Sequence, residues 1–136
     1  MDGLAKECIY CICLNAKSAV ISSDRVAEGT VSSVPLQPRN VLEKAMRHNA
    51  HAVILAHNHP GGNPRPSIQD RQMTRNLQYV LSSAEVPLLD HLIVSDTKMF
   101  SFANQRLMEE IHFENGGDAI AQKRLPYDVG TAPDTP

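Results

Sequence analysis

The sequence predicts one α/β domain, an α+β sandwich in which a mixed β-sheet is flanked by helices. Two observations predict it. Apolar runs of strand length and segments of helical periodicity follow one another in the order strand, strand, helix, strand, helix, strand, strand. The 136 residues correspond to a single domain, and 42% hydrophobic with 21% charged residues is the composition of a globular chain with one core.

The first half of the chain predicts two antiparallel strands followed by a helix. Residues 7–15 (ECIYCICLN) form a continuous apolar run of strand length, and residues 18–30 (SAVISSDRVAEGT) alternate loosely after a short turn. Residues 39–49 (RNVLEKAMRHN) carry apolar side chains at helical spacing, beginning at Val41, and Asn49 is a suitable stop.

The second half predicts a buried strand, a long helix and a final pair of strands. The first of these, AHAVILAH, reads as a central strand covered on both faces. The loop NHPGGNPRP holds three prolines and two glycines, so it cannot continue either neighbouring element. The predicted ranges are strand 50–57, loop 58–66, helix 67–85, strand 86–95, edge strand 96–102 and a short helix 104–111.

The last part of the sequence is predicted to be a tail. From residue 114 onward no periodicity is sustained, and residues that favour turns are frequent. We therefore assign residues 1–113 to the domain and residues 114–136 to a flexible C-terminal tail.

Charge and hydropathy exclude several classes of protein. The formal net charge of −2 does not support a nucleic-acid partner, which would favour a strong basic excess or a clustered basic face. No apolar run approaches the roughly 18 residues of a membrane span, and the N-terminal residues lack the pattern of a signal peptide. The sequence therefore predicts a cytoplasmic protein.

Three cysteines, Cys8, Cys11 and Cys13, lie in the first predicted strand. Cys8 and Cys11 have the Cys-x-x-Cys spacing of metal and redox sites. In a strand, however, residues three apart point to opposite faces, and the chain has no second cysteine pair to complete a zinc site. We predict three reduced cysteines that pack as small apolar side chains.

A metal site is predicted where the strand 50–57 ends. Side chains two apart in a strand face the same way, so His57 and His59 can direct both imidazoles to one point while Asn58 faces the other side. Imidazole nitrogen is a common zinc ligand, and a carboxylate oxygen is a regular third partner. Asp70 can supply it, because the intervening loop can return the chain to the strand end.

Asp70 also has a simpler interpretation as part of a helix cap. Ser67 as N-cap and an acid at the third helical position form a capping pattern that needs no metal. Two histidines on the same face beside a stiff loop favour the metal site over a cap alone, because burying two imidazoles without a cation or acid to share them is costly. We therefore expect a cap whose carboxylate also serves a metal site.

Hydrolysis at such a site needs two further groups. A general base must take and return a proton, and a donor must stabilise the developing oxyanion. The carboxylates that can supply the base are Glu7, at the head of the first strand, and Glu28, before the turn at Gly29. Ser67 can donate a hydrogen bond to the oxyanion while it caps its helix.

The string HNHPGGNPRPSIQD resembles the JAMM signature, in which His-x-His is followed by seven residues, Ser, two residues and Asp. The four matching positions are His57, His59, Ser67 and Asp70. Two later strings, LLDHLIVSD and FSFANQRLM, resemble the RadC branch of the JAB/MPN superfamily. The resemblance extends from about residue 7 to residue 108.

The resemblance implies a mixed sheet flanked by helices in a cytidine-deaminase-like layout, with Zn²⁺ held by His57, His59 and Asp70. It also implies a first-strand glutamate that acts as general acid and base; Glu7 is the most similar in position and Glu28 is the weaker candidate. The expected function is a JAMM-type zinc metallopeptidase that hydrolyses peptide or isopeptide bonds of a protein or peptide substrate. The alternative is a DNA-repair-associated or DNA-processing metal-binding protein without peptidase activity.

Overall fold

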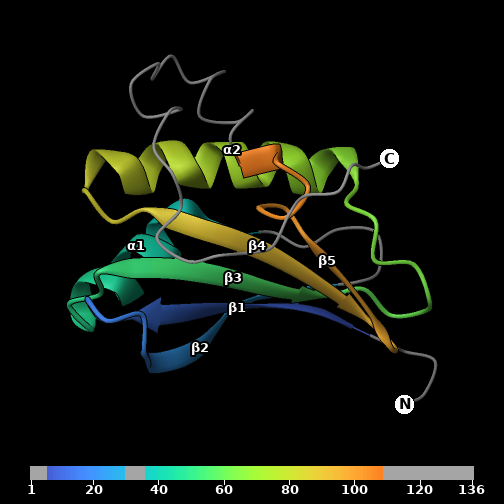
Figure 1. Ribbon diagram of the computed structural model, residues 1–136, viewed down its shortest axis with the longest axis horizontal. Coiled ribbons are helices and arrows are strands. Elements are labelled where there is room, and N and C mark those ends of the chain that lie inside the picture. The colour runs from blue at the N-terminus through green and yellow to red at the C-terminus, as the bar shows by residue number, and fades with distance from the viewer. Residues whose placement is uncertain (1–5, 30–35, 109–136) are drawn as a thin grey trace.

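The computed structural model of the chain describes residues 6–29 and 36–108 (Figure 1). These residues form one five-stranded sheet and two helices, which confirms the predicted mixed α/β architecture. In chain order the elements are β1 (Glu7–Leu14), β2 (Val20–Gly29), α1 (Pro38–Arg47), β3 (Ala52–Asn58), α2 (Ile68–Ser83), β4 (Leu88–Ser95) and β5 (Lys98–Ser101).

The sheet is mixed because one pairing between neighbouring strands is parallel. Its strand order is β2-β1-β3-β4-β5. β3 and β4 pair in parallel, and α2 supplies the crossover connection that parallel strands require. The other pairings, β1 with β2, β1 with β3 and β4 with β5, are antiparallel. The start of β1 and the ends of β3 and β4 therefore meet at the same end of the sheet (Figure 1).

One hydrophobic core lies between the sheet and both helices. Val41 and Ala45 of α1 are four residues apart, as are Leu77 and Leu81 of α2, so each helix presents one apolar side. These four side chains pack with buried residues of β1, β3 and β4, among them the fully buried Leu55. Both helices consequently cover the same face of the sheet.

The opposite face of the sheet is only partly covered. On this face of β3, Ile54 is half-buried and Asn58 is exposed. A small second cluster of Leu14, Ala52 and Leu89 buries one end of the face. The prediction that this strand is covered on both faces is therefore wrong, because the two helices of the described chain pack on one side.

The cysteines follow the two-residue period of β1. Cys11 and Cys13 are buried on the helix-covered face with their Sγ atoms 3.9 Å apart, whereas Cys8 is half-buried. All three are free, and Cys11 and Cys13 pack in the core as predicted, whereas Cys8 lies outside it. Burial, and next the neighbouring Cys13, raise the pKa of the Cys11 thiol above its ordinary value.

The turn after β5 replaces the start of a predicted helix. Residues 102–106 are turns, and helical backbone begins only at Leu107. Asp90 of β4 explains the turn: its carboxylate accepts hydrogen bonds from the Ser101 hydroxyl at 2.7 Å and from the Ala103 backbone N–H at 2.9 Å. These bonds hold the backbone in a conformation that the sequence pattern did not reveal.

The predicted tail, residues 114–136, and the predicted domain boundary lie outside the described residues. In the part of the chain that is described, neither helix has the length and apolar character needed to cross a membrane.

Candidate metal centre

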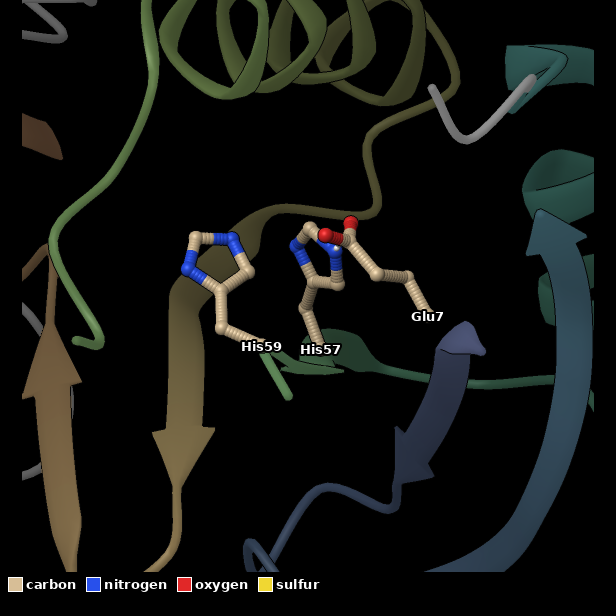
Figure 2. Close-up of side chains that lie close together, drawn as sticks. All are labelled: Glu7, His57 and His59. Carbon is tan, nitrogen blue, oxygen red and sulfur yellow. Dashed lines mark hydrogen bonds and ion pairs between the residues drawn. The ribbon is translucent and has the colours of Figure 1, made fainter. Parts of the chain in front are cut away.

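Two histidines lie at the open end of β3, one in the strand and one just beyond it. His57 is 2% exposed, and the backbone N–H of His59 donates to the Val94 carbonyl of β4 at 2.8 Å, so the chain stays extended past the strand end. The two imidazole rings lie edge to face with centroids 4.7 Å apart (Figure 2). The structure therefore brings both predicted histidines together.

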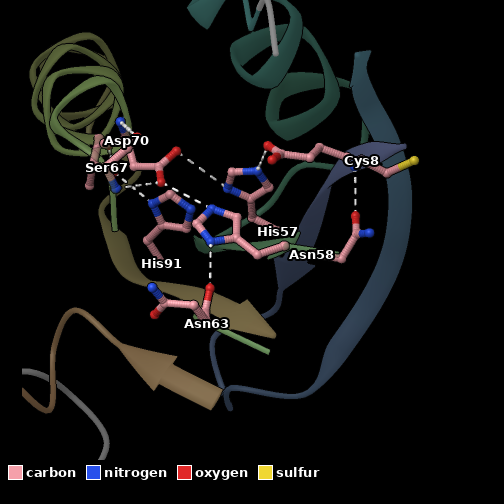
Figure 3. A network of polar contacts seen from close by, with 10 residues as sticks. Cys8, His57, Asn58, Asn63, Ser67, Asp70 and His91 are labelled. Carbon is pink, nitrogen blue, oxygen red and sulfur yellow. Dashed lines mark hydrogen bonds and ion pairs between the residues drawn. The ribbon is translucent and has the colours of Figure 1, made fainter. Parts of the chain in front are cut away.

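Asp70 reaches both imidazoles from the first turn of α2 (Figure 3). Its Oδ2 lies 3.1 Å from His59 Nε2, and its Oδ1 lies 3.6 Å from His57 Nδ1. The same carboxylate closes a capping box, since it accepts from the Ser67 N–H at 2.8 Å while Ser67 Oγ accepts from the Asp70 N–H at 3.0 Å. Asp70 thus caps the helix and contacts the histidines at once.

Glu7 joins the cluster from the start of β1 (Figure 2). Its Oε1 lies 3.0 Å from His57 Nε2, and the residue is 8% exposed. The contact depends on the antiparallel pairing of β1 with β3, in which Ile9 lies opposite His57 and Glu7 is one side-chain repeat further along the same face. Three separate elements therefore supply the four side chains that converge at this point.

Glu28, the other predicted carboxylate, has different partners. It pairs with Lys6 at 2.6 Å and with Arg25 at 3.3 Å at the edge of the sheet. The hydrogen bond from Lys6, and next its charge, hold the pKa of Glu28 below its usual value. A general base works best with a pKa near the working pH, so this environment favours Glu7 over Glu28 for that role.

Hydrogen bonds indicate which imidazole nitrogens carry free lone pairs. His59 Nδ1 lies 3.2 Å from the Asn63 carbonyl, which can only accept, so a neutral His59 keeps its lone pair on Nε2. Glu7 is likewise an acceptor for His57 Nε2, so a neutral His57 keeps its lone pair on Nδ1. Both of these nitrogens face Asp70.

The two imidazoles, together with the carboxylates of Glu7 and Asp70, form a set of donor atoms that fits a divalent cation. The ligand atoms of Glu7, His57 and His59 lie within 4.8 Å of one another. The 3.1 and 3.6 Å contacts of Asp70 bracket the edge of about 3.3 Å that bonds of ~2.0–2.1 Å make in a tetrahedron. His57 Nδ1 is buried and, within the described chain, has no hydrogen-bond partner. A buried polar atom without a partner is costly, and a cation would use its lone pair.

The sequence interpretation missed a set of buried contacts next to the site, which Thr74 and His91 make with Asp70 and His57. Thr74 of α2 donates to the Asp70 carbonyl at 2.7 Å, and its hydroxyl lies 2.6 Å from His91 Nδ1. The His91 ring stacks on His57 at 5.7 Å and on Phe102 at 4.7 Å. Burial, and next the neighbouring His57, lower the pKa of His91 to about 3, so this imidazole is neutral. The one signal for it was a histidine inside the apolar string LLDHLIV.

Asp90 is hydrogen-bonded within β4 and with the turn that follows β5. Its Oδ1 accepts from the His91 backbone N–H at 2.7 Å, in addition to its two bonds with the turn after β5. These three bonds secure β4 and the turn that follows β5.

A buried histidine near the end of a central strand, a partly buried histidine just beyond it, an aspartate from a capped helix and a glutamate from the neighbouring strand define the JAB/MPN class of metal-site domains. The family described as the RadC-like JAB domain matches residues 1–107. The chain belongs to this family.

Curated relatives agree with this assignment. A UPF0758 protein of Stenotrophomonas maltophilia is 40% identical over 108 residues, which are 79% of this chain and 46% of the relative. A UPF0758 protein of Symbiobacterium thermophilum is 44% identical over 108 residues with the same coverage. One of Cupriavidus pinatubonensis is 43% identical over 100 residues, 74% of this chain and 44% of the relative. The chain spans a little under half the length of these relatives, and their names state no activity.

Proposed function

We propose that this domain is a zinc-dependent hydrolase of peptide or isopeptide bonds, of the JAMM type, with the ion held by His57, His59 and Asp70. Membership of the RadC-like JAB family supports a metal-dependent hydrolase. The observation that carries the proposal is the 3.0 Å contact of Glu7 with His57, which puts a carboxylate beside the set of ligands. A zinc ion, when bound, acts as a Lewis acid and makes water a nucleophile near neutral pH.

Glu7 is suited to move the proton in this reaction. One of its oxygens, Oε1, is engaged by His57, so Oε2 remains to accept a proton from the attacking water. The same carboxyl can then return the proton to the amine that leaves when the amide bond breaks. Because Glu7 is almost buried, little bulk water competes for this proton.

Ser67 is suited to stabilise the developing oxyanion. Its Oγ accepts from the Asp70 N–H, and a hydroxyl that accepts in this way still has its own hydrogen to donate. The residue is exposed at the mouth of the site, so a substrate carbonyl can approach it. Capping the helix and donating to substrate use different parts of the same hydroxyl.

A hollow beside His59 is suited to receive the substrate. It has a volume of about 390 Å³ and is lined by Asn58, His59, Gly61 and Asp96, among others. An extended peptide that lies in it has one amide beside His59. This position keeps the rest of the substrate outside the buried part of the centre.

The test compares Glu7→Gln with Glu28→Gln, which makes the same change of charge in the surface pair with Lys6. Glu7→Gln should keep one zinc per chain and lose hydrolysis by about 10²- to 10⁴-fold, the usual contribution of a general base. Glu28→Gln should keep both zinc and hydrolysis. The substrates are defined peptides, isopeptide conjugates, and single-stranded and duplex DNA.

Two results would contradict the proposal. If Glu7→Gln hydrolyses peptides or conjugates as fast as the wild type, Glu7 is not the base. If the zinc-loaded wild type acts only on DNA, or binds DNA with no hydrolysis of any peptide substrate, the DNA-processing alternative replaces the peptidase.

A further inference from the structure

Asn58 lies between the two histidines in sequence and faces the opposite side of the sheet. Its carboxamide makes two hydrogen bonds with the start of β1. Oδ1 accepts from the Cys8 backbone N–H at 2.6 Å (Figure 3), and Nδ2 donates to the Lys6 carbonyl at 2.9 Å. Lys6 and Cys8 are the two neighbours of Glu7. The carboxamide is thus hydrogen-bonded to the backbone on both sides of Glu7.

These bonds occur where the backbone pairing of β1 with β3 has ended. The last pair is Ile9 opposite His57, whereas the pairing of β1 with β2 continues to Glu7 opposite Gly29. Without Asn58, the backbone of the first residues of β1 would be hydrogen-bonded from the β2 side alone within the described chain. The carboxamide extends the hydrogen bonding on the β3 side by the length that Glu7 needs.

We propose that Asn58 is the positioning residue for Glu7, and this inference rests on the proposed function of Glu7 as the base. Asn58 holds the Glu7 backbone from the open face, and the Glu7 side chain points to the helix-covered face, where it contacts His57. The two residues act from opposite faces of the sheet because side chains alternate between the faces along a strand.

Few side chains can replace the carboxamide in this position. Asparagine offers an acceptor and a donor on one short group, aspartate offers acceptors only, and leucine offers neither. A shift of about 1 Å in a catalytic group can cost about 10²-fold in rate. Loss of the two hydrogen bonds should therefore impair the base without removing any of the three predicted metal ligands.

The experiment begins with the metal-free full chain, so that it depends on neither zinc nor hydrolysis. Native-state hydrogen exchange and the ¹⁵N resonances of the His57 ring are measured at one fixed pH in the wild type, Asn58→Leu, Asn58→Asp and Glu7→Gln. Asn40→Leu, an exposed position of α1, is the matched control. Glu7→Gln supplies the reference spectrum for an altered Glu7–His57 contact.

We expect the Cys8 amide to exchange about five- to tenfold faster in Asn58→Leu, as the loss of one hydrogen bond predicts, while the Cys11 amide is unchanged. The His57 resonances should move toward those of Glu7→Gln. Asn58→Asp, which keeps the acceptor for Cys8, should lie between the wild type and Asn58→Leu, and it also serves if Asn58→Leu does not fold. Unchanged Cys8 exchange, or unchanged His57 resonances despite faster exchange, would overturn the proposal.

A second arm uses the zinc-loaded protein and a peptide that the wild type hydrolyses. Asn58→Leu should keep its zinc and lose kcat by at least about tenfold, because positioning affects the base. Because Asn58 also lines the hollow beside His59, the comparison rests on kcat and on the zinc content. Equal losses in Asn40→Leu, or a loss of zinc, would assign a merely structural role to Asn58. If the wild type hydrolyses nothing, the proposed function fails, and the metal-free arm still decides whether Asn58 positions Glu7.

Discussion

The dual use of Asp70 leads to a prediction about zinc and stability. Asp70→Asn should keep the capping box, because the amide oxygen still accepts from the Ser67 N–H. It should weaken zinc binding, because a neutral amide replaces the carboxylate that contacts both imidazoles. The variant therefore separates the two roles of one side chain.

The size of the effect follows from linkage between binding and folding. At a free zinc concentration of 100 times Kd, binding raises the free energy of unfolding by about 2.7 kcal/mol. Residues that only support metal ligands change affinity by up to about 100-fold, so a direct ligand should change it by at least that factor. The same zinc concentration would then stabilise the variant by at most about 0.4 kcal/mol. The expected difference is at least about 2.3 kcal/mol.

The assay is urea denaturation of the wild type and Asp70→Asn with and without zinc. Glu28→Gln makes the same change of charge in a surface ion pair and should keep the full zinc increment. The reasoning fails if zinc stabilises Asp70→Asn as much as the wild type. It also fails if Glu28→Gln loses the increment, because the effect would then follow net charge and not coordination.

The remaining predictions concern the core and the thiols. Leu55→Ala, at a fully buried position of β3, should lower the free energy of unfolding by about 2–5 kcal/mol in urea denaturation. Val94→Ala, at a position that is 40% exposed, should lower it by less than about 1.5 kcal/mol. Equal losses in the two variants would contradict the assigned core. The Cys11 thiol should make the free energy of unfolding fall at alkaline pH. Its pKa is raised in the folded state, so the thiol ionises first in the unfolded chain. The contribution of Cys11 to the free energy of unfolding is therefore fully present below about pH 9 and falls above it by at most about 1.4 kcal/mol per pH unit. Cys11→Ala should reduce this slope in urea midpoints measured between about pH 8 and pH 10, and an unchanged slope would show that other groups cause it.

Local structure could be predicted where an element is stabilised within its own segment. The helix expected over residues 67–85 spans Ile68–Ser83, because the capping box of Ser67 and Asp70 sets its start independently of the rest of the fold. The covering of β3 could not be predicted in the same way. An apolar run indicates burial, but which faces are covered depends on where both helices pack.

The site residues also differ in whether local sequence or tertiary contacts determine their positions. His57 and His59 could be paired from the two-residue period of a strand, and Asp70 from its place after a stiff loop. The contact of Glu7 with His57 joins residues 50 apart and depends on the register of β1 against β3. The residues alone therefore left Glu7 and Glu28 as alternatives, and only the family resemblance favoured Glu7. The stacking of His91 on His57 is likewise a tertiary contact that periodicity does not encode.

The most direct test of the central claim is a crystal structure of the zinc-loaded domain, with anomalous diffraction at the zinc edge to locate the ion. The proposal predicts one zinc bound by His57, His59 and Asp70 at ~2.0–2.2 Å, with Glu7 near the open coordination position but not bound to the metal. A zinc bound by Glu7 with both histidines and without Asp70, or a zinc on the cysteines of β1, would contradict it.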